Sequence, residues 1–268
     1  MLKKSIKHEW KATWKRMAGI NGAVLGLGLL GSLGVIGVLN NVSIPDLLVA
    51  IYVFAYIVIL IASSIVTYFM IASRYYKSIF TDEGYLTNTL PITSDQKILS
   101  RFLISLFWTI VNILCIFGSV LFLLVPLFSE GIRRNKESMD IFFSQIEVMF
   151  ASMAHELGFS SPALLIVFMV VICLIGYIYF ILSVYFSISM GSLFSSHRIL
   201  AAVLIYFGLN ILMQALMTGM SLFDFILSSS FGSSFSLTLL FYSLIDLALA
   251  VVFYLVCRYL IDHRLNLQ

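Results

Sequence analysis

Six long apolar runs alternate with short polar segments along the chain, and this alternation is the strongest signal in the sequence. Each run holds about 20 residues or more, which lets a helix cross a hydrocarbon core of about 30 Å at a rise of about 1.5 Å per residue. The pattern predicts an all-α membrane protein with six transmembrane helices. The expected spans are Met17–Leu39, Leu47–Ser73, Phe102–Phe128, Ala163–Met190, Ile199–Gly219 and Leu237–Cys257.

The first 16 residues (1–16) form a basic, amphipathic stretch ahead of the first expected span. Leu2, Ile6, Trp10 and Trp14 recur at four-residue spacing, with basic residues around them. Tryptophan side chains suit the headgroup boundary of a membrane, so this pattern predicts an N-terminal elbow helix lying on the inner leaflet. The alternative is an ordinary positively charged anchor without a mechanical role.

The longest connection, residues 129–162, lies between the third and fourth spans. Its apolar residues recur at spacings of three and four, which predicts an amphipathic helix of about five turns on the outer face. This helix would cap an exit path or bind a partner, or it would simply rest on the outer leaflet or the bundle. Its apolar positions are Met139, Phe142, Phe143, Ile146, Met149, Phe150, Met153 and Leu157.

Composition agrees with a membrane protein. The chain is 61% hydrophobic and 11% charged, whereas soluble domains average roughly 45–50% apolar and 25% charged residues. With both termini inside, 13 of the 16 basic residues fall in cytoplasmic segments, and the cytoplasmic and outer segments carry net charges of +8 and −4. Because loop lysines and arginines favour the cytoplasm, we expect an N-in, C-in chain with a cytoplasmic tail at 258–268.

The same charge distribution bears on the partners of the chain. Basic residues gathered on the cytoplasmic side favour contact with anionic lipid of the inner leaflet, and not with nucleic acid.

Sequence motifs of the common enzyme classes are missing. No Gly-x-x-x-x-Gly-Lys-Ser/Thr motif is present, and the stretch HELGF at His155–Phe159 lacks the second histidine of a zinc-protease motif. No Gly-x-Ser-x-Gly motif and no metal-ligand spacing of Cys and His occur either. We therefore expect no catalytic site, no metal and no cofactor in this chain.

One charged residue falls at membrane depth. Asp246 lies near the middle of the last expected span, and a bare carboxylate there costs about 2.5–3.5 kcal/mol. Asn210 and Gln214 on the fifth span and Asn112 on the third are candidate hydrogen-bond partners. These four residues either line a translocation path or only satisfy one another between helices, and the sequence leaves both interpretations open.

The cytoplasmic segment between the second and third spans, residues 74–101, is polar and contains several residues that start or end helices. Asp82 and Glu83 suit the first turn of a short helix, and Pro91 would end it. Thr93 and Gln96 have the spacing of a capping box that starts the next helix. We therefore expect a short, rigid helix across the membrane base.

The run DEGYLTNTLPITSDQKILSR, residues 82–101, resembles the cytoplasmic loop of the ABC-2-type transporter permease family. In that family an acidic-Gly-x-Leu stretch, a Leu-Pro or similar break, and a basic residue recur between spans two and three. The six-span layout, the N-terminal elbow and the short turn at Ser192–Arg198 fit the family too. The matching positions are Glu83, Gly84, Leu86, Leu90, Pro91 and Lys97.

The resemblance implies a single transmembrane domain over residues 1–268, working as the permease subunit of a bacterial plasma-membrane exporter of peptides, lipids or drug-like molecules. ATP and Mg²⁺ would bind a separate ATP-binding subunit, and a second permease chain, identical or a sister, would complete the complex. The loop helix would be the coupling helix that docks on the ATP-binding subunit, with Asp82, Glu83, Gly84, Tyr85, Leu86, Leu90 and Pro91.

Two other functions remain open on the sequence alone. One is an ATP-independent secondary transporter or channel, which would place more polar groups within the spans and need no docking helix. The other is a membrane scaffold or sensor that transports nothing. The transported substrate, the direction of transport and the identity of the ATP-binding subunit do not follow from the sequence.

Overall fold

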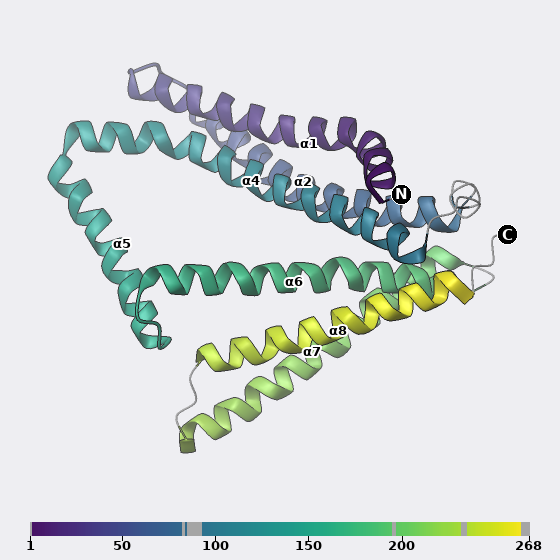
Figure 1. The fold of residues 1–268 in the computed structure, drawn as a ribbon. Helices are drawn as coiled ribbons and strands as arrows, with labels where there is room; N and C mark the ends of the chain where they lie inside the picture. The colour runs from purple at the N-terminus through teal and green to yellow at the C-terminus, as the bar shows by residue number, and fades with distance from the viewer. Residues whose placement is uncertain (1, 82–83, 85–92, 195–196, 232–234, 264–268) are drawn as a thin grey trace. The chain divides into compact units, whose positions relative to one another are not determined.

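The computed structural model describes residues 2–81, 84, 93–194, 197–231 and 235–263, and everything regular in this part of the chain is helical (Figure 1). Six of its helices are long and apolar enough to span a membrane, so the chain is a multi-pass membrane protein, as predicted. The helices are α1 (Leu2–Leu39), α2 (Asp46–Phe80), α4 (Ser94–Arg134), α5 (Lys136–Glu156), α6 (Pro162–Gly191), α7 (Arg198–Phe231) and α8 (Phe235–His263).

The helices divide into two compact units, each described here by itself. Unit 1 contains residues 1–73 and 103–146, which include α1 and most of α2 and α4. Unit 2 contains residues 74–102 and 147–268, so the residues on both sides of segment 82–92 group with the C-terminal helices. Within unit 2, α6 packs against both α7 and α8.

Unit 1 is held together by polar and small residues that face each other within apolar helices. On α1 and α4, Asn112 Nδ2 donates to Asn21 Oδ1 over 2.9 Å. Tyr56 of α2 shares a hydrogen bond of 2.8 Å with Ser119 of α4, and Gly28 of α1 packs directly on Ser119. In lipid, where burial of apolar surface does not drive helices together, such close approach and hydrogen bonding hold the helices in contact.

The N-terminal stretch is helical, and its position on the inner leaflet stays a prediction. Residues 2–16 continue into the first span as one helix, α1, without a break at residue 16, although the ribbon bends near its N-terminal end (Figure 1). The buried residues of this stretch are Glu9 and Thr13, whereas Trp10 and Trp14 of the predicted amphipathic face are exposed. Thr13 packs against α4, where its hydroxyl accepts a hydrogen bond from the Trp108 indole nitrogen over 3.0 Å.

The helix predicted between the third and fourth spans is confirmed as α5, with 21 residues, and its location on the outer face stays a prediction. It follows α4 almost directly, because α4 continues past the expected span to Arg134. The turn after α5 places Gly158 at φ +79°, a left-handed conformation that glycine adopts without steric cost. Ser161 then caps α6, its hydroxyl accepting from the Leu164 backbone N–H over 3.4 Å.

Candidate functional site

Segment 82–92 joins the C-terminal end of α2 to the start of α4, and its two ends are the candidate functional site. Among the predicted coupling residues, Asp82, Glu83, Tyr85, Leu86, Leu90 and Pro91 lie outside the described residues. Gly84 is described: it is buried, and its N–H donates to the Thr81 carbonyl over 2.7 Å. A Cβ on Gly84 would overlap the Ile79 carbonyl, so this position requires glycine.

The α2 side of the site is fixed to α6 by Tyr75. Its side chain is fully buried, and its hydroxyl shares a hydrogen bond of 2.9 Å with Ser189. Its ring stacks on Tyr185 with the centroids 3.8 Å apart and the planes 5° from parallel. A stacked pair with a satisfied hydroxyl combines dispersion with a directional bond, so the last turns of α2 and the end of α6 are held as one piece.

The two sides of the site are joined to each other by Arg101. This arginine is only 4% exposed, and its guanidinium reaches back 23 residues to Ser78, donating to the Ser78 hydroxyl and, over 3.2 Å, to the Ser78 carbonyl. It also donates to the Lys97 carbonyl over 2.6 Å. A buried guanidinium is stable only when its N–H groups have acceptors. Arg101 therefore ties the start of α4 to the end of α2.

The α4 side is fixed to the end of α8. Asp95 accepts a hydrogen bond of 2.7 Å from the Tyr254 hydroxyl and lies 3.3 Å from the Arg258 guanidinium. The Ser94 hydroxyl donates to Asp262. Half-exposed ion pairs add little stability by themselves, but together these groups fix the position of the first turn of α4.

We call Tyr75, Ser78, Ser94, Asp95 and Arg101 the loop anchor. They hold both ends of segment 82–92 and connect them to α6 and α8 within unit 2. The Thr93 half of the predicted capping box is also present, since Thr93 Oγ1 accepts from the Gln96 N–H over 3.4 Å.

The loop anchor was missed from the sequence. In the sequence, Arg101 resembles the other basic residues of the cytoplasmic segments, and only its burial in the structure distinguishes it from them. The one available signal was the pair of tyrosines at 75 and 76, next to the end of an apolar run.

The four predicted path residues are distributed between the two units. Asn112 lies in unit 1, paired with Asn21. In unit 2, the Asn210 amide donates to the Tyr206 carbonyl over 2.8 Å, and the Gln214 side chain is exposed. Asp246 is half-buried, and no hydrogen bond joins it to Asn210 or Gln214 among the described residues. Their role in a translocation path stays a prediction.

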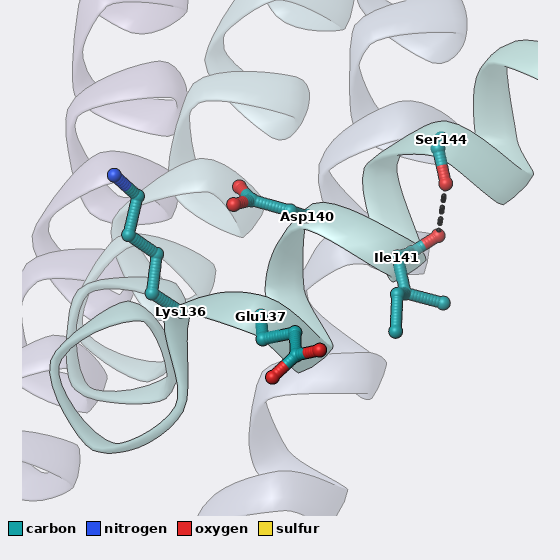
Figure 2. Close-up of a pocket in the computed structure, with 5 residues that line it drawn as sticks. All are labelled: Lys136, Glu137, Asp140, Ile141 and Ser144. Carbon is teal, nitrogen blue, oxygen red and sulfur yellow. Dashed lines mark hydrogen bonds between the residues drawn. The ribbon is translucent and has the colours of Figure 1, made fainter.

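Two shallow hollows lie elsewhere on the described surface. One, of about 590 Å³ on α5, is lined by Lys136, Glu137, Asp140, Ile141 and Ser144 (Figure 2). The Ser144 hydroxyl donates to the Ile141 carbonyl within the helix over 2.8 Å. The other, of about 690 Å³ in unit 2, is lined by Tyr76, His197, Arg198, Ile199, Leu200 and Val203. In the described part of the chain, no three His, Cys, Asp or Glu side chains gather as metal ligands would.

Comparison with family models, with curated proteins and with solved structures found no match to this chain. The resemblance of residues 82–101 to the ABC-2-type permeases therefore rests on the motif positions themselves.

Proposed function

We propose that this chain is the permease subunit of an ABC-2-type transporter in a bacterial plasma membrane, driven by a separate ATP-binding subunit that docks on segment 82–91. The multi-pass helical architecture is compatible with that role. The loop anchor is the observation that carries the proposal. A docking segment can move membrane helices only if its ends are attached to them.

The attachment runs through specific contacts on each side. Tyr75 joins the end of α2 to α6, and Asp95 joins the start of α4 to α8. Arg101 links the two sides directly. A displacement of segment 82–91 would therefore be carried into α6 and α8, instead of being absorbed by a flexible connection. A plain connection between two spans would need none of these contacts.

Within this proposal the chain exports a peptide, lipid or drug-like molecule and pairs with a second permease chain, identical or a sister. ATP and Mg²⁺ bind the ATP-binding subunit. The N-terminal part of α1 acts as the elbow at the inner leaflet. The half-buried Asp246 lies within the α8 span, where a carboxylate needs polar surroundings, and is our candidate for the path wall.

Affinity purification of the chain from membranes of its native host tests this function. We expect an ATP-binding subunit to co-purify at a ratio near one per permease chain. A variant with residues 83–86 scrambled should lose that subunit, while a variant with residues 137–140 of α5 scrambled should keep it. Purification of the intact chain without any ATP-binding subunit would overturn the proposal and favour an ATP-independent transporter, a channel or a scaffold.

A further inference from the structure

The N-terminal part of α1 presents four lysines on one face. Lys4, Lys7, Lys11 and Lys15 are all exposed, and their spacing of three and four residues aligns them along the helix. Thr13, two residues from Lys11 and Lys15, lies about 200° round the helix from each of them and is buried against α4. The lysine face therefore points away from the packed side of α1.

A tryptophan borders the lysine face. Trp14, which is 45% exposed, lies one turn from Lys11 on the same helix. Exposed tryptophan is typical of the boundary between headgroups and hydrocarbon. The same helix runs on into the apolar span without a break, so the lysines lie within about 20 Å of the hydrocarbon at 1.5 Å per residue.

We infer that Lys4, Lys7, Lys11 and Lys15 bind the phosphate groups of anionic lipid headgroups, with Trp14 at the headgroup boundary. The positive charge of this face favours an anionic partner. The exposed tryptophan and the continuous apolar span favour lipid over an acidic protein, which would not need an indole at that depth. The inference does not depend on the permease proposal, because a channel or scaffold with this helix would bind the same lipid.

The lipid-binding segment is in direct contact with α4. Trp10 stacks on Trp108 with the centroids 5.1 Å apart, and the Trp108 indole donates to Thr13. Trp10 also makes an edge contact with Phe107, at 5.0 Å. Headgroups bound to the lysine face would therefore hold in place a segment that is packed on α4 within unit 1.

The tryptophan content of the chain allows a test without labels. The protein has three tryptophans, Trp10, Trp14 and Trp108, and all of them belong to this region. Brominated lipids quench tryptophan on contact. The full chain is reconstituted in phosphatidylcholine bilayers that contain an equal mole fraction of either brominated phosphatidylglycerol or brominated phosphatidylcholine, and the quenching is compared.

For the wild-type chain we expect brominated phosphatidylglycerol to associate about threefold more strongly than brominated phosphatidylcholine. This preference is only a modest part of the electrostatic attraction that four lysines have for an anionic surface. In the combined variant Lys4→Gln, Lys7→Gln, Lys11→Gln, Lys15→Gln, the two brominated lipids should quench the tryptophan fluorescence equally. The control variant Arg133→Gln, Arg134→Gln, Lys136→Gln, which removes basic residues on α4 and α5, should keep the preference.

A salt titration of the wild-type chain gives a second measurement that needs no variant. Raising the salt from about 0.1 M to about 1 M shortens the Debye length from about 10 Å to about 3 Å. The preference for phosphatidylglycerol should then disappear. Equal quenching by the two lipids in wild type, or a preference that survives either high salt or the lysine substitutions, would overturn the inference; equal quenching would leave an acidic protein as the partner of this face.

Discussion

Replacing Gly28 by alanine is expected to lower the free energy of unfolding of unit 1 by about 1–3 kcal/mol, the usual cost of overpacking a tight contact. A Cβ at Gly28 would lie 2.8 Å from the Cα and the carbonyl oxygen of Ser119. Because these are backbone atoms of α4, they cannot rotate away, and α1 must move off. The same displacement would strain the hydrogen bond between Asn21 and Asn112 on the same pair of helices.

The matched control is Gly22→Ala on the same helix. Nothing lies within 4 Å of a Cβ at Gly22, so the change should be neutral or stabilise the helix by up to about 1 kcal/mol. Unfolding by sodium dodecyl sulfate, followed by tryptophan fluorescence, measures both variants, since the fluorescence comes from α1 and α4. Equal stability of the two variants would contradict the close packing of Gly28 on Ser119.

Arg101→Met is expected to destabilise the loop anchor and to uncouple ATP hydrolysis from the permease. Methionine keeps much of the side-chain volume but leaves the Ser78 carbonyl without the donor that reaches it across 23 residues. The loss of a buried, charged hydrogen-bond donor costs about 2–3 kcal/mol. Under the proposed function, the ATP-binding subunit would still bind, because Arg101 lies outside the docking segment. Its ATP hydrolysis should then lose its dependence on the permease.

Two further variants separate the geometry of Arg101 from its charge. Arg101→Lys keeps the charge but not the planar fork of donors, and should fall between wild type and Arg101→Met. Arg133→Met removes an exposed arginine and should behave as wild type in both stability and ATP hydrolysis. If Arg101→Met matches wild type in both measurements, then the two ends of segment 82–92 are not joined as the contacts indicate.

The spans were predictable because each is a long apolar run, and such runs in a chain of this composition form membrane helices. The ends of the helices were not predictable from these runs. α4 continues to Arg134 and α1 begins at Leu2, since a helix does not stop where the hydrocarbon stops. A change from apolar to polar residues marks the membrane boundary, whereas only a capping residue or a left-handed turn, as at Gly158, marks the end of the helix.

Contacts between helices were the hardest feature to predict from the sequence. Depth in the membrane alone groups Asn112 with Asp246, whereas the structure pairs Asn112 with Asn21. Periodicity shows that a residue shares a face with its neighbours on one helix, but it does not show which helix that face meets. The role of Arg101 was hidden for the same reason, since its partner Ser78 lies on the far side of segment 82–92.

Site-specific photo-cross-linking tests most directly whether segment 82–91 docks on an ATP-binding subunit. A photoreactive amino acid is placed at the position of Tyr85 in one variant and of Ser144, on α5, in another, and membranes of the native host are irradiated. We expect the Tyr85 variant to cross-link to an ATP-binding subunit and the Ser144 variant not to. No cross-link from position 85, or an equal yield from both positions, would contradict docking through this segment.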